Sequence, residues 1–192
     1  MELLGSDVLA DQRYLVPPSP PGVTGLAWLR AHVARFCDGP THARRRALTD
    51  ALLAGLTIQP GSSDPTAALL CALDLPEESA ADVALVAGAY QPHAQQSAEA
   101  DAALERLVEA CGPRDESTAA RICVVVQAHG AVKALLANRQ NGVSGPPVPT
   151  TRRIGPDGRT VEVDLTDAPF GRGRHACPGR SITEQLVGGL VP

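Results

Sequence analysis

The chain has 192 residues, 44% hydrophobic and 20% charged, which fits one globular domain around a single core. A formal net charge of -4 and an aromatic content of only 3% exclude the basic surface and stacking platforms of nucleic-acid binding. We find no apolar run long enough to span a bilayer and no signal peptide, so we expect a cytoplasmic protein with no membrane partner.

The first 22 residues are expected to be irregular because they end in a proline-rich run. Helical patterns then follow one another over residues 24–36, 41–56, 66–73, 77–90, 97–111 and 117–138. In the last and longest of these, the run from Ile122 to Val126 is apolar on every side, as expected of a central buried helix.

The character of the chain changes after residue 141, where a linker rich in glycine and proline begins. Two alternating stretches, 151–154 and 160–163, flank a Pro-Asp-Gly turn and predict a β-hairpin. We therefore divide the chain into an irregular arm over residues 1–23 and a single domain over residues 24–192.

The most informative stretch follows the hairpin and reads Phe-Gly-Arg-Gly-Arg-His-Ala-Cys-Pro-Gly over residues 170–179. Gly171 and Gly173 permit positive φ and a close approach of the backbone to a flat partner. Pro178 suits the first turn of a helix, which would place Cys177 at the helix N-terminus, lower the pKa of its thiol and favour metal ligation. A structural cysteine in a tight turn is the alternative interpretation.

This order of residues resembles the haem-ligand loop of the cytochrome P450 superfamily, Phe-x-x-Gly-x-His/Arg-x-Cys-x-Gly. Its fixed positions are filled by Phe170, Gly173, His175, Cys177 and Gly179. The resemblance implies haem b as the cofactor and Cys177 as the axial ligand of its iron. It also implies a mainly α fold, reduced in size, with a small β-hairpin before the ligand loop. By these motifs the chain resembles a truncated, roughly half-length member of bacterial type.

Two further segments resemble the same family. His42 and Arg46 fit its His-x-x-x-Arg pattern, in which both side chains lie on one helical face and hold a haem propionate. A solvated basic face is the other interpretation of that spacing. In the first strand of the hairpin, Arg153, with Arg152 as the second choice, matches an arginine that reaches a propionate. His175 is the remaining propionate partner that the resemblance implies.

The segment 117–138 resembles the helix that crosses the haem face in this family. Its usual acid and alcohol fall on Gly130 and Ala131, and the Glu-x-x-Arg motif of the family has no match. Gln127 takes the position that normally lies closest to the iron. We hypothesise that its amide acts in the distal pocket as a hydrogen-bond donor or weak ligand; a bond to the backbone is the alternative.

The resemblance implies a haem-thiolate oxidoreductase, either a monooxygenase or a peroxide-driven variant, acting on a small organic molecule. A ferredoxin-type redox partner or hydrogen peroxide would then be required. The alternative is a non-catalytic haem-binding or partner-docking protein derived from a P450. A thiol enzyme using Cys177 and His175 is disfavoured, because side chains so close in sequence do not easily adopt base–nucleophile geometry. Self-association or a partner subunit is expected to cover surfaces that a shortened fold exposes.

Overall fold

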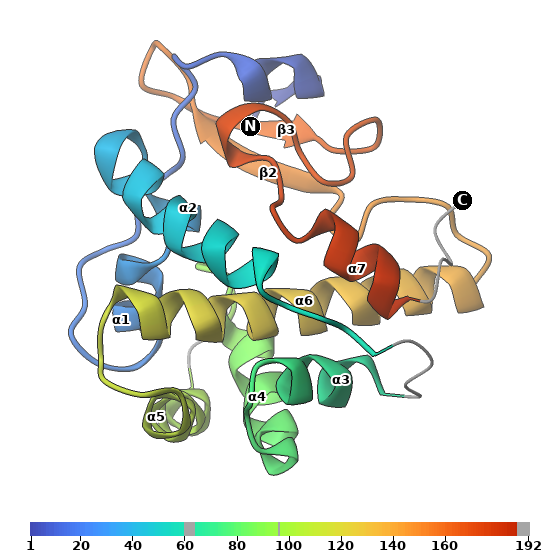
Figure 1. Cartoon of the computed structure of the whole chain (residues 1–192). Coiled ribbons are helices and arrows are strands. Elements are labelled where there is room, and N and C mark those ends of the chain that lie inside the picture. Colours follow the sequence, from blue (N-terminus) through green and yellow to red (C-terminus); the bar gives the residue numbers. More distant parts are fainter. Residues whose placement is uncertain (60–63, 96, 188–192) are drawn as a thin grey trace.

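The structure of the protein is a computed structural model, and it describes residues 1–59, 64–95 and 97–187. Within these ranges the chain forms seven α-helices and one three-stranded sheet (Figure 1). The predicted mainly α fold, with a small hairpin before the cysteine-containing loop, is therefore confirmed. Residues 60–63, between the helices predicted over 41–56 and 66–73, lie outside the described residues.

The helices are α1 (Gly25–His32), α2 (Gly39–Ala54), α3 (Pro65–Ala72), α4 (Ala80–Ala89), α5 (Ala98–Cys111), α6 (Glu116–Gln140) and α7 (Arg180–Leu186). Four short 3-10 helices accompany them: η1 (Ser6–Ala10), η2 (Ala34–Phe36), η3 (Glu77–Ser79) and η4 (Gly173–His175). Asp64, Ser97 and Asp115 cap α3, α5 and α6, since each side chain accepts a hydrogen bond from a backbone N–H of the first turn.

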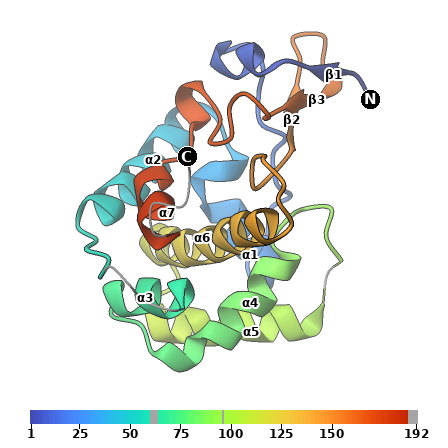
Figure 2. The same cartoon turned by 90° about the vertical axis from the view of Figure 1, so that its right-hand side faces the viewer.

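The longest helix, α6, separates two parts of the molecule. Helices α3, α4 and α5 lie on one side of it, whereas α2, α7 and the sheet lie on the other (Figure 1, Figure 2). Its apolar run from Ile122 to Val126 is buried in the main hydrophobic core. The prediction of a central buried helix is confirmed.

By length and mean hydropathy alone, α6 could cross a membrane, which corrects the expectation that no apolar run is long enough. The core helix of a soluble protein passes the same test. Because the residues of α6 pack against those of α1, α4 and α5 in the main core, we interpret it as a core helix.

The small sheet lies at one end of the molecule and includes the start of the chain. Strands β2 (Thr150–Ile154) and β3 (Thr160–Asp164) form the predicted antiparallel hairpin, with Gly158 at φ +78° in its turn. Strand β1 (Leu3–Leu4) pairs in parallel with the free edge of β3. The valines of β3 pack on Leu9 in a second, smaller core.

The start of the chain is therefore not the irregular arm that its composition predicts. Residues 3–10 form β1 and η1, and Leu15 forms a bridge with Ile154 beside β2. The proline-rich run that follows has no regular secondary structure. The sequence could not reveal β1, because a two-residue strand forms only where a distant partner offers a free edge.

Two helix boundaries also differ from prediction. Val33 is extended, with φ −100° and ψ 160°, so the helix expected over 24–36 ends at His32 and η2 follows separately. The next helix begins at Gly39 rather than after Thr41. Asp38 holds its N-cap position, but its carboxylate makes no capping bond, and the reason for this lies in the site below.

Candidate functional site

Residues 170–179, here called the cysteine loop, join the sheet to α7. Gly171 and Gly173 have φ of +70° and +66°, as predicted for left-handed positions. The N–H of Cys177 donates to the carbonyl of Phe170 at 2.7 Å and closes the loop. Phe170 is half-buried, whereas the side chain of Cys177 is exposed. The loop therefore holds an exposed thiol on a fixed backbone, within electrostatic range of Cys123 on α6.

Gly173 is the point at which the cysteine loop meets the N-terminal segment. A Cβ there would lie 2.6 Å from the carbonyl oxygen of Leu9 and 3.0 Å from the Cα of Ala10. Because φ is also positive, we expect Gly173→Ala to lower the free energy of unfolding by about 2–4 kcal/mol. Urea unfolding followed by circular dichroism measures this. Gly145→Ala is the matched control, since nothing lies within 4 Å of the added Cβ; equal stability of the two variants would contradict the prediction.

The loop does not place Cys177 inside a helix. Helix α7 begins at Arg180 with Gly179 in the N-cap position, so Cys177 precedes the cap by two residues. Desolvation by the surrounding protein raises the pKa of its thiol, although a backbone hydrogen bond from Gly179 and the charges of Arg46 and Arg35 oppose this. The prediction of a lowered pKa is therefore wrong: without a bound cation, the thiol is neutral at pH 7.

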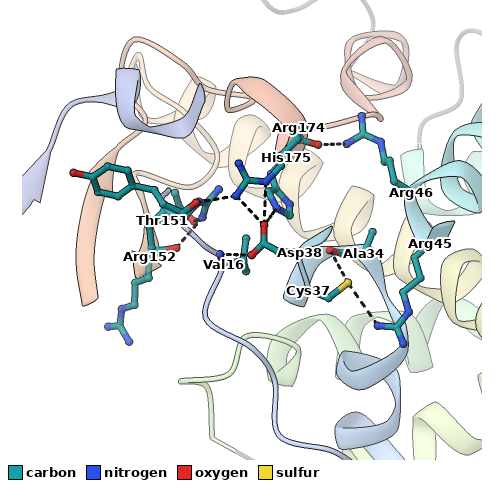
Figure 3. Close-up of polar contacts among 12 residues, drawn as sticks. Val16, Ala34, Cys37, Asp38, Arg45, Arg46, Thr151, Arg152, Arg174 and His175 are labelled. Carbon is teal, nitrogen blue, oxygen red and sulfur yellow. Dashed lines mark hydrogen bonds and ion pairs between the residues drawn. The ribbon is translucent and has the colours of Figure 1, made fainter. Parts of the chain in front are cut away.

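Arg46 connects α2 to the cysteine loop. Its Nη1 donates to the carbonyl of Ala176 at 2.8 Å. It also donates to the carbonyl of Arg174 at 3.3 Å, a bond that Figure 3 shows. Its Nε pairs with Asp50 at 2.7 Å, one turn further along α2. This arginine thus fixes the backbone immediately before Cys177.

The carboxylate of Asp38 binds two basic side chains of the cysteine loop, those of Arg174 and His175 (Figure 3). Its Oδ1 accepts hydrogen bonds from Nε2 of His175 and Nη2 of Arg174, both at 2.9 Å, and its Oδ2 accepts from the N–H of Val16 at 2.7 Å. The ring of His42 lies against that of His175, with centroids 4.0 Å apart. Sequence reasoning missed this role of Asp38, because its only visible signal was its place before a helix start.

Burial governs the protonation of both histidines. It lowers the pKa of His175 to about 4, despite the hydrogen bond to Asp38. It also lowers the pKa of His42, and the charge of Arg46 acts in the same direction. Burial raises the pKa of the Asp38 carboxyl, but the hydrogen bonds from its donors outweigh burial and hold that pKa below its ordinary value. At pH 7 the site therefore contains two neutral imidazoles and one carboxylate.

We expect stability to fall between pH 7 and pH 5. The unfolded chain protonates His175 near its ordinary pKa of 6.5, whereas the folded protein excludes that proton until about pH 4. Because the unfolded state binds more protons in this window, His175 alone removes about 2 kcal/mol of stability at pH 5. Urea unfolding at the two pH values measures the loss. His175→Gln should remove most of it, and the same change at the exposed His93 should not; an unchanged pH dependence in His175→Gln would count against this assignment.

Arg153 on β2 is a buried cation. It is 7% exposed, and its Nη1 donates to the hydroxyl of Thr151 and the carbonyl of Arg152. No carboxylate forms an ion pair with it in the part of the chain that the structure describes, and burial lowers its pKa to about 10. The side chain of Arg152 is instead 50% exposed and lies 3.8 Å from Glu162. Of the two predicted candidates, Arg153 is therefore the one that faces the site. A buried cation without an ion-pair partner favours an anionic ligand.

Gln127 on α6 is half-buried and bonded at both ends of its amide. Its Nε2 donates to Sγ of Cys123 at 2.8 Å, and its Oε1 accepts from Nη1 of Arg35 at 2.9 Å. The amide thus contacts side chains, not backbone. Arg35 was not predicted, because no motif marks it. His129, on the same helix, instead bonds the hydroxyl of Thr66 at 2.8 Å.

No protein-family model matches the sequence, and no curated protein matches it at a significant level. Among solved structures, P450BioI in complex with hexadec-9Z-enoic acid ligated acyl carrier protein matches with a TM-score of 0.68 and 14% identity, over 95% of this chain and 80% of that one. Ligand-free Mycobacterium smegmatis CYP164A2 matches with a TM-score of 0.60 and 18% identity, over 95% of this chain and 79% of that one. The chain has a cytochrome P450-like fold.

The residues of this site fit a thiolate-ligated haem, whose iron takes a cysteine sulfur and whose two carboxylates need partners. Cys177 offers an exposed thiol. Asp38 forms an ion pair with Arg174, and Asp50 forms one with Arg46. No described carboxylate pairs with the buried Arg153. No group of three or more His, Cys, Asp or Glu side chains among the described residues could hold a metal ion alone. A haem site nevertheless needs only one protein ligand, because the macrocycle itself binds the iron.

Proposed function

We propose that the chain is a haem-thiolate oxidoreductase, a cytochrome P450-like monooxygenase or a peroxide-driven variant, acting on a small organic molecule. One observation carries the proposal: within a P450-like fold, an exposed thiol lies in the same loop as a histidine on which Arg153 acts, and Arg153 is a buried cation with no described ion-pair partner. Arg153 acts electrostatically on His175, which belongs to the same loop as Cys177. In this proposal the chain is a truncated, bacterial-type P450 that works in the cytoplasm.

Each residue singled out by sequence has a role in this proposal. Cys177 would be the axial ligand of haem b. The groups that would hold its carboxylates are basic or imidazole side chains: His42, Arg46, Arg153 and His175. The loop positions that would shape the surface facing the macrocycle are Phe170, Gly173 and Gly179.

A bound haem with a thiolate ligand supplies oxidation chemistry at carbon. The chain's own residues prepare the site for it. The backbone hydrogen bond from Gly179 favours the thiolate form of Cys177. Arg46 fixes the carbonyl of Ala176, and therefore the backbone that carries the thiol. Gln127 would act on the distal side, with its amide orientation set by Arg35.

The source of protons and electrons separates the two variants of the proposal. Gly130 and Ala131 stand where the resemblance places an acid and an alcohol, and neither side chain can transfer a proton. Hydrogen peroxide supplies its own protons, so it suits this site better than a ferredoxin-type partner does. P450BioI holds an acyl carrier protein in its structure; for this chain, a partner subunit or self-association is part of the proposal.

A non-catalytic haem-binding or partner-docking protein is the second candidate, and the same two small residues, Gly130 and Ala131, favour it. Both candidates use the same cofactor site. Turnover, rather than cofactor binding, therefore distinguishes them.

The test begins with purified protein titrated with haemin. After reduction with dithionite under carbon monoxide, thiolate ligation gives a strongly red-shifted Soret band. Hydrogen peroxide, or a ferredoxin with its reductase, is then added with a panel of small substrates. Product formation supports the enzyme, and ligation without turnover supports the second candidate. Failure to take up haem contradicts both.

A further inference from the structure

The side chain of Arg35 connects three elements around the candidate site. It comes from η2, its Nη1 donates to Oε1 of Gln127 on α6 at 2.9 Å, and its Nη2 donates to Oε1 of Gln91 after α4 at 3.3 Å. Gln127 is itself held by Cys123, whose Sγ lies 3.3 Å from the hydroxyl of Tyr90. A guanidinium is thus positioned by two neutral amides.

The charge of Arg35 has no counter-ion. Arg46 pairs with Asp50 and Arg174 with Asp38, but no described carboxylate lies within ion-pair distance of Arg35. The residue is half-buried, and its guanidinium lies 5.7 Å from the centroid of the Phe36 ring. The guanidinium of Arg35 has five N–H donors, and the two amide oxygens accept from only some of them. Such a cation is complementary to a ligand anion.

Arg35 differs in position from the groups assigned to the cofactor carboxylates. His42, Arg46 and His175 contact one another or the cysteine loop, and Arg153 lies on β2 beside them. Arg35 alone among the site's cations bonds to α6. Its charge also acts on Cys123 and Tyr90, and it reaches Cys177 and Arg153 of the cofactor site as well. It therefore faces the α6 side of the site.

We infer that Arg35, positioned by Gln91 and Gln127, binds the carboxylate of the substrate, which is an organic acid with an apolar body. This inference rests on the proposed function and names the substrate class of the same site. The guanidinium of Arg35 carries one positive charge, which matches one carboxylate, whereas a phosphate ester would leave excess negative charge. The fork of guanidinium donors matches a carboxylate bidentately.

The test compares acids with their neutral esters on the haem-loaded protein. Decanoic acid with methyl decanoate, and phenylacetic acid with methyl phenylacetate, are titrated by calorimetry and by the shift of the Soret band. We expect at least one acid to bind about tenfold or more tightly than its ester, as a charge-assisted hydrogen bond implies. Arg35→Gln should abolish this preference and leave ester binding unchanged.

Arg44→Gln is the matched control, because Arg44 is an exposed arginine paired with Glu116 away from the site. It should keep the preference for the acid. Equal binding of acid and ester in both pairs, or an unchanged preference in Arg35→Gln, overturns the inference alone. Weakened haem uptake by Arg35→Gln also overturns it, since Arg35 would then serve the cofactor. Wild-type protein that takes up no haem overturns the proposed function, and this inference with it.

Discussion

Cys177→Ser is expected to abolish the red-shifted Soret band of the reduced, carbon monoxide-treated protein. A serine hydroxyl does not ionise in the range where a thiol does, so the thiolate ligand and its electron donation are lost. The fold should be retained, with a change in unfolding free energy within about 0.5 kcal/mol, because the side chain is exposed and belongs to neither core. Absorption spectra and urea unfolding on the same sample separate the two effects.

Cys71→Ser is the matched control. Cys71 is also an exposed free cysteine, but it lies on α3 and no site residue contacts it. Its spectrum should equal that of the unmodified protein. If Cys177→Ser kept the red-shifted band, or if both variants lost it, iron ligation by Cys177 would be refuted.

What the sequence revealed of the site was local in the chain. Gly171 and Gly173 could be assigned positive φ because only glycine adopts it freely, and both have it. His42 and Arg46 could be placed on one helical face from their spacing of four residues. The helix start predicted at residue 97 agrees with the structure, in which the side chain of Ser97 accepts a local N–H bond.

What the sequence could not reveal depends on residues far apart. Asp38 binds His175 and Arg174, which lie more than a hundred positions away. No residue next to Asp38 in the sequence indicates these partners. The partners of Arg35, Gln127 and Gln91, are also distant along the chain, at 92 and 56 positions. The pKa of Cys177 was predicted in the wrong direction because desolvation, the largest contribution, comes from surrounding protein that no local pattern describes.

The same limit explains the N-terminal segment. Its proline-rich composition predicted an irregular arm, yet Leu9 belongs to the small core and its carbonyl approaches Gly173. The glycine was correctly expected to allow a close approach. Its partner is the protein's own backbone, however, so the segment supports the cysteine loop directly.

Asp38→Asn is expected to cost about 2–3 kcal/mol of unfolding free energy. The carboxylate accepts from His175, Arg174 and the N–H of Val16, and its side chain is only 20% exposed. An amide keeps the shape but removes the charge, and its NH2 group would face donors. The guanidinium of Arg174 would then be partly buried without a counter-ion, which is the costly outcome for a broken pair.

Asp50→Asn is the control for removing a carboxylate from α2. Asp50 pairs with Arg46, but its side chain is 52% exposed, so water replaces the lost partner and the cost should stay below about 1 kcal/mol. Urea unfolding at pH 7 measures both variants.

A double-mutant cycle then isolates the bond between Asp38 and His175. If the bond stabilises the cysteine loop, Asp38→Asn combined with His175→Gln should cost less than the sum of the single changes. Strict additivity would show that this bond adds nothing to stability, and that Asp38 acts through Arg174 and the N–H of Val16 instead. In that case Asp38 would fix the cysteine loop through its ion pair with Arg174, and His175 would not contribute to that effect.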